Sequence, residues 1–82
     1  MPALETPPED WEVEYVERVL LRNIPLISVI VRTLRDYYGI LTTAREVMRI
    51  LEKFVGSATY PLEFTDKELK ILKIIRTEFI TG

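Results

Sequence analysis

Few side chains of this 82-residue chain have the chemistry of a catalytic or metal site, because the sequence contains no histidine and no cysteine. Histidine is the commonest metal ligand and the side chain best suited to proton transfer near neutral pH. Cysteine would supply a thiolate ligand or a disulfide. No motif places a general base beside the remaining hydroxyl and amine groups, and three glycines are too few for a phosphate-binding loop. We therefore expect no enzyme, no catalytic residue, no metal or other cofactor and no small-molecule substrate.

The side chains best suited to recognition lie near the N-terminus and are Trp11, Tyr15, Arg18 and Arg22. With about 100° between successive helical residues, these four form one stripe. The apolar arc that would face the core is separate and consists of Val13, Val16, Val19 and Leu20. Aromatic and arginine side chains are enriched at interface hot spots because they bury a large area and can still form hydrogen bonds through a polar group. We predict that the stripe binds a partner protein or a second copy of the chain. The alternative is that its rings fold onto the body beneath the arginines.

A second set of side chains could contact nucleic acid. Residues 24–38, the turn at 39–42 and residues 43–55 resemble a helix-turn-helix in outline, a motif whose second helix enters the major groove of DNA. The resemblance implies four groove-facing residues, Thr43, Arg45, Arg49 and Lys53. Three lysines share one arc of the last expected helix, namely Lys67, Lys70 and Lys73.

Acidic residues weaken this nucleic-acid hypothesis. Glu46 and Glu52 are each three positions from Arg49, the spacing of ion pairs along a helix. Their carboxylates would also face phosphates, whose charge dominates protein–DNA affinity. Arg35 stands four positions before the turn glycine, where the motif has a small residue. A DNA-binding helix-turn-helix protein is therefore the alternative to a protein-binding module.

The acidic N-terminal region favours a helix. Residues 1–8 are rich in proline and acid, and we expect a flexible tail there. The acids that follow suit the positive end of a helix, which predicts one over residues 9–22. Apolar and polar residues also alternate over 11–16, which is the pattern of a strand. Paired with residues 59–64, such a strand would give a winged-helix fold with a small two-stranded sheet.

Capping residues set the other expected helices. Asn23 is a typical N-cap and Gly39 a typical C-terminal stop, which together predict a helix over 24–38. Two pairs have the spacing of a capping box and predict helices over 43–55 and 66–80, namely Thr43 with Glu46 and Thr65 with Glu68.

The expected fold is all-α. Residues 9–82 would form a single domain, a small irregular or orthogonal four-helix bundle, because the helices are short and their apolar faces broad. Residues 24–38 should form the central helix, since their polar arc is confined to Arg32, Arg35 and Asp36.

The net charge of −2 conceals an asymmetry. Six acids and no basic residue occupy the first 17 positions, which leaves the rest of the chain with a balance of +4. The chain has no glutamine and one asparagine, a depletion that predicts a thermophilic source. It shows no secretory signal and no apolar run long enough to span a membrane, so we expect a cytoplasmic protein that binds no membrane.

Together these features predict a non-enzymatic protein–protein interaction module. We expect a small accessory subunit of an intracellular assembly, including one that processes nucleic acid, or a homo-oligomer. The first helix has more apolar surface than one small core can use, and it should supply the contact.

Overall fold

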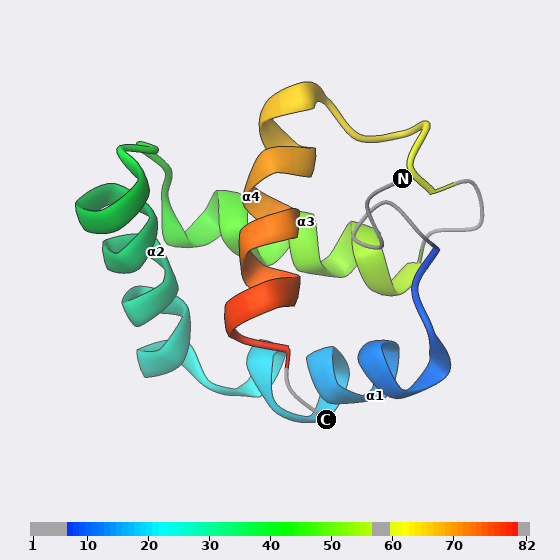
Figure 1. Cartoon of the computed structure of the whole chain (residues 1–82). Coiled ribbons are helices and arrows are strands. Elements are labelled where there is room, and N and C mark those ends of the chain that lie inside the picture. Colours follow the sequence, from blue (N-terminus) through cyan, green and yellow to red (C-terminus); the bar gives the residue numbers. More distant parts are fainter. Residues whose placement is uncertain (1–6, 57–59, 81–82) are drawn as a thin grey trace.

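A computed structural model of the chain describes residues 7–56 and 60–80. Its elements are α1 (Asp10–Arg18), the single 3-10 turn η2 (Leu20–Arg22), α2 (Ile24–Tyr38), α3 (Ala44–Gly56) and α4 (Asp66–Glu78) (Figure 1). The all-α prediction is confirmed.

The described residues contain no strand, so the winged-helix alternative is not supported. Residues 11–16 are helical, and residues 60–63 form turns, followed by a bend at Phe64. Residues 1–6 of the expected tail and residue 59 of the expected strand lie outside the described part of the chain.

Local signals fix both ends of α2. The Asn23 side chain accepts the backbone N–H of Leu26 at 3.1 Å, and Pro25 occupies the first turn, where an N–H has no helical partner. Gly39 ends the helix in the left-handed conformation, with φ 67°. The next N–H, of Ile40, returns to the carbonyl of Leu34 at 2.9 Å and satisfies an end group of the helix. The predicted helix over 24–38 is confirmed at both ends.

The two predicted capping boxes differ. Thr65 Oγ1 accepts the Glu68 N–H at 3.2 Å, and the Glu68 carboxylate accepts the Thr65 N–H at 2.9 Å, so that box is complete. At the start of α3, Thr43 Oγ1 accepts the Glu46 N–H at 3.1 Å. The Glu46 carboxylate instead accepts the hydroxyl of Thr42, and this box is half formed.

The helix predicted over residues 9–22 is interrupted. α1 ends at Arg18, and Val19, with φ −112° and ψ −63°, leads into η2. The Asn23 N–H donates to the Leu20 carbonyl at 3.2 Å, which closes this tighter turn. The turn buries Leu20 fully and places Asn23 where it caps α2. A switch from α- to 3-10 geometry at a helix end leaves no mark in apolar periodicity.

The central helix is α3, so the prediction that residues 24–38 form the centre is wrong. α3 packs against α1, η2, α2 and α4. Figure 1 shows α4 crossing in front of α3, with α2 beyond one end and α1 below. α3 places four fully buried side chains in the core, namely Val47, Ile50, Leu51 and Phe54.

α2 is a peripheral helix. It packs against α3 and η2 through a single face, on which Ile27, Ile30 and Leu34 are fully buried. Leu26 and Val31 are partly buried beside this face, and much of the remaining apolar surface is uncovered. Apolar composition shows what a helix could bury and not how many neighbours it has. Val29 is 46% exposed and Tyr37 is 82% exposed.

Candidate interaction surface

The aromatic and basic stripe predicted near the N-terminus is divided between two elements. Trp11, Tyr15 and Arg18 lie on α1, whereas Arg22 lies on η2, beyond the interruption. Trp11 is 45% exposed, and Tyr15 is half-buried and packs against the core. Arg18 is exposed and lies 3.7 Å from the Glu14 carboxylate. That these residues bind a partner stays a prediction.

The first helix has little unused apolar surface. Val19 and Leu21 are partly buried against the core, together with Tyr15. Trp11 is the one large hydrophobic residue of α1 that is exposed. The first helix was expected to have more apolar surface than one small core can use, and in the structure only Trp11 of α1 remains as strongly exposed apolar surface.

Two of the predicted nucleic-acid contacts are engaged within the fold. Lys53 Nζ donates to the Glu63 carbonyl at 2.7 Å and to Glu68 Oε1 at 2.9 Å, and it lies over the Phe64 ring. Lys67 Nζ lies 3.4 Å from Glu46 Oε1. These pairs connect α3 to α4, so both lysines have a structural role.

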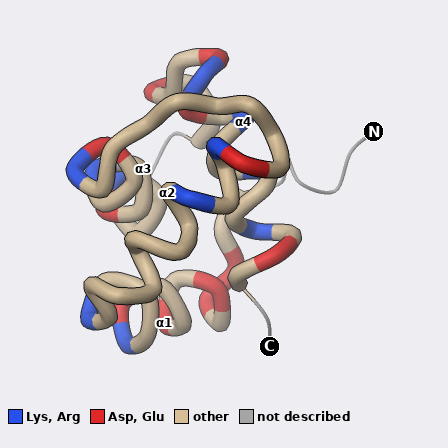
Figure 2. Tube along the Cα trace, turned by 90° about the vertical axis from the view of Figure 1, so that its left-hand side faces the viewer, with Lys and Arg blue, Asp and Glu red and all other residues tan. Residues whose placement is uncertain are grey.

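The structure leaves the other predicted contacts on a mixed surface. Thr43 caps α3, and Lys73 is half-buried. Arg45, Arg49 and Lys70 are exposed. Figure 2 shows acidic segments beside basic ones on several helices, in place of a uniformly basic face.

The surrounding cations and hydrogen bonds lower the pKa of two glutamates below their ordinary value of 4.5. For Glu46, the main cause is the hydrogen bond from Thr42; burial opposes it, and the charges of Lys67 and Arg49 add to it. For Glu68, burial alone would raise the pKa, but hydrogen bonds from the Thr65 N–H and the Lys53 ammonium outweigh it. Both carboxylates are therefore ionised at neutral pH and offset nearby positive charge.

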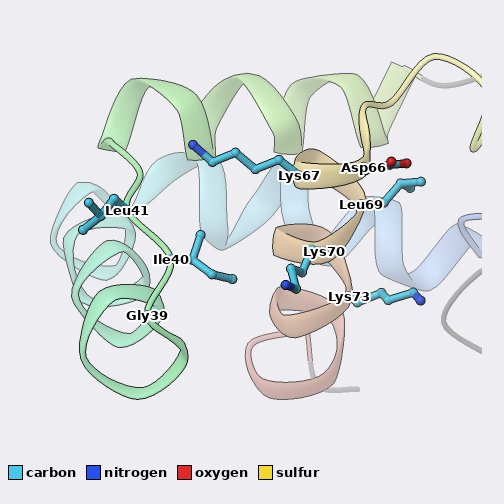
Figure 3. Close-up of a pocket in the computed structure, with 8 residues that line it drawn as sticks. All are labelled: Gly39, Ile40, Leu41, Asp66, Lys67, Leu69, Lys70 and Lys73. Carbon is cyan, nitrogen blue, oxygen red and sulfur yellow. The ribbon is translucent and has the colours of Figure 1, made fainter.

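A hollow of about 890 Å³ lies between the turn after α2 and the first half of α4. Ile40 and Leu41 border it on the turn, and Lys67 and Lys70 border it on α4. Figure 3 shows the two lysines on the side of α4 that faces Ile40. Three further lining residues point to the opposite side of α4, namely Asp66, Leu69 and Lys73. The lining of the cleft thus combines an apolar turn with three lysines, Asp66 and Leu69 of α4.

The turn has this composition because of how α2 ends. The left-handed Gly39 redirects the chain and carries Ile40 back against the core, where it is half-buried. Leu41 then points outward and is 73% exposed. Removing an exposed aliphatic side chain from water is favourable, so burial of Leu41 against an apolar partner would stabilise the complex.

A second hollow, of about 340 Å³, lies between α2 and the end of α4. Thr33, Tyr37 and Tyr38 border it from α2, and Glu78 and Phe79 border it from the end of α4. Both hollows thus lie between α4 and the chain from Thr33 to Leu41. We call this region the 37–41 surface and define it as Tyr37, Tyr38, Ile40, Leu41, Lys67 and Lys70.

Tyr37 and Tyr38 fall within residues 24–38, which were expected to form the central helix, and Leu41 was given no role. Apolar pattern alone does not separate these tyrosines from core residues, because adjacent helical residues can both be buried, as Ile50 and Leu51 are on α3. The structure leaves Tyr37 82% and Tyr38 42% exposed. Leu41 lies outside every predicted helix, so periodicity did not apply to it.

A buried ion pair connects α1 to α4. Arg76 donates from Nε to Glu12 Oε2 at 2.9 Å and from Nη2 to Glu12 Oε1 at 2.6 Å. Its guanidinium lies 5.3 Å from the ring centre of Phe54 and 5.8 Å from that of Tyr60. Burial would lower the pKa of Arg76, but the contacts with Glu12 and Tyr60 raise it, so the guanidinium stays charged. We assign this pair to fold stability, because it is enclosed and its partners are satisfied.

No known protein family, curated protein or solved structure matches the chain. Within residues 7–56 and 60–80, no helix is long and apolar enough to cross a membrane. The same residues hold no cluster of acidic side chains that could bind a metal ion. The functional proposal therefore depends on the geometry of the surface alone.

Proposed function

We propose that this chain is a non-enzymatic interaction module that binds another protein through the 37–41 surface. The main support for this proposal is the distribution of exposed hydrophobic residues. Seven large hydrophobic residues of the described chain are exposed, and three of them, Tyr37, Tyr38 and Leu41, belong to this surface. Concentrated exposed apolar surface is typical of protein interaction sites. An accessory subunit of a larger assembly would have this combination of a small core and an uncovered helix.

The aromatic stripe near the N-terminus is a weaker candidate for the main contact than the 37–41 surface. Its arginines suit an interface, but Tyr15 contributes to the core and Trp11 is the one strongly exposed apolar member. We propose it as a secondary contact that could extend an interface.

Direct nucleic-acid binding is the second proposal. Arg45 and Arg49 are exposed on α3, the position of the recognition helix in a helix-turn-helix. Glu46 lies between them, and the pairs formed by Lys53 and Lys67 reduce the available positive charge. We rank this function below protein binding for that reason.

The test compares co-purification by three forms of the full-length chain, expressed in the cells that naturally make it. The forms are the parent, the double variant Tyr37→Ser with Leu41→Ser, and Leu62→Ser as a control. Leu62 is 85% exposed and borders neither hollow of the 37–41 surface, so the control removes a similar exposed side chain. We expect a stoichiometric partner with the parent and the control, and a loss of about tenfold or more with the double variant. Retention of the partner by the double variant would overturn the proposal.

A further inference from the structure

We infer that the segment bound at the 37–41 surface is an acidic, amphipathic helix of a partner protein. Its apolar face would contact the turn at Ile40 and Leu41, and its carboxylates would contact Lys67 and Lys70. The inference rests on the proposed function and adds the chemistry of the partner.

The charge of the cleft favours an acidic partner. Lys70 is exposed and forms no ion pair or hydrogen bond with any described residue. Lys67 keeps half of its side chain exposed although it pairs with Glu46, so it can contact a second carboxylate. Complementary charges steer association and fix the orientation of the bound chain.

The shape of the cleft favours a helix. Apolar side chains of the turn border it on one side, and α4 borders it on the other with three lysines against one aspartate, so an occupant needs an apolar face and an acidic flank. An amphipathic helix supplies both, with apolar anchors at i, i+3 and i+4 and charges beside them. Tyr37, which is 82% exposed, borders the second hollow together with Phe79.

The same features disfavour a nucleic-acid occupant. A phosphate backbone would face the exposed aliphatic side chain of Leu41, where it gains no hydrogen bond. An acidic helix can instead direct its carboxylates at the lysines and its leucines at the turn.

The experiment measures fluorescence anisotropy of labelled helical peptides titrated with the full-length chain. The probe is a peptide of about 16 residues with leucines along one face and glutamates on both flanks. Its controls are the same peptide with lysines, or with glutamines, in place of the glutamates. A labelled DNA duplex is titrated in parallel.

We expect the acidic peptide to bind with a Kd of the order of 10 μM and at least about tenfold more tightly than both controls. Its affinity should fall as salt is raised from about 50 to 500 mM. Lys70→Glu should weaken it about tenfold, and Leu41→Ser by a similar factor. Arg32→Glu is the matched control, because Arg32 is an exposed basic residue that borders a different hollow, between α2 and the start of α3. Circular dichroism of each variant confirms that it is folded.

Two outcomes would overturn the inference. One is equal binding of the acidic and glutamine peptides, and the other is tighter binding of the DNA than of any peptide. If the acidic peptide fails but the cellular partner is lost from the Tyr37→Ser, Leu41→Ser variant, the partner chemistry is wrong and the proposed function stands. If the acidic peptide fails and the double variant also keeps its partner, the partner chemistry and the proposed function are both wrong.

Discussion

Glu12 and Arg76 are 64 positions apart in the chain, and they form a buried two-point ion pair with N–O distances of 2.6 and 2.9 Å. The same carboxylate accepts the Glu9 N–H at 3.1 Å at the start of α1. One side chain therefore caps α1 and holds it against α4.

Glu12→Gln is expected to destabilise the fold by about 3 kcal/mol. The amide keeps an oxygen for the Glu9 N–H but leaves the buried Arg76 charge without its counter-ion, and this kind of loss costs about 3–5 kcal/mol. Urea denaturation followed by circular dichroism measures it. Glu14→Gln, which breaks an exposed pair with Arg18 on the same helix, should change stability by less than about 0.5 kcal/mol. Equal effects of the two variants would show that the buried pair contributes little.

Gly39→Ala is expected to destabilise the protein by about 1 kcal/mol. An added Cβ would meet no atom within 4 Å, so the cost is the left-handed backbone itself, at φ 67°. Gly39→Asn should cost less, because asparagine tolerates that conformation. Gly56→Ala is the control, since it also has open space and no positive φ. A thermal midpoint unchanged by Gly39→Ala would contradict the assigned turn.

Acid should remove a stabilising contribution of Glu68. Its pKa is lowered in the folded state, so its contribution is complete above the ordinary value of 4.5 and is lost as the pH falls through the folded-state pKa. Glu68→Gln should therefore cost about 2 kcal/mol at pH 7, and the difference from the parent should shrink below about pH 4. Urea titrations across this range measure it. Glu63→Gln is the control, because that carboxylate is exposed and forms no ion pair with described residues. A difference for Glu68→Gln that stays constant with pH would contradict the assignment.

Local signals predicted the helices well, and long-range packing could not be predicted. Asn23, Gly39 and the box of Thr65 with Glu68 act within a few residues, so the ends that they set were correct. The interruption at Val19 depends on how the chain must turn for Leu20 to enter the core. Periodicity identifies apolar faces, but it does not show which of them finds a neighbour.

The candidate surface was missed for the same reason. Tyr37 and Tyr38 satisfy the apolar pattern of α2, and their exposure follows from the peripheral position of that helix. The lysines of α4 were identified from sequence, but the partners of Lys53 and Lys67 come from elsewhere in the chain. Sequence thus identified the charges of the surface and not its apolar half.

The fluorescence of Trp11 can distinguish the two proposed protein contacts, the 37–41 surface and the α1 stripe. It is the only tryptophan and is 45% exposed, so its emission reports on burial of the α1 stripe. If the 37–41 surface is the main contact, emission should be independent of protein concentration, and Trp11→Ala should keep full helicity and peptide affinity. A blue shift with rising concentration would instead indicate self-association through α1. Loss of helicity in Trp11→Ala would show that the ring belongs to the core.

The most direct test of the proposed function is site-specific photo-crosslinking in the cells that make the protein. A photoreactive phenylalanine analogue is placed at position 41 in one sample and at position 62 in another, two positions that are similarly exposed. We expect a discrete protein adduct from position 41 and none from position 62. No protein adduct at position 41, or the same adducts at both positions, would contradict an interaction surface at the turn after α2.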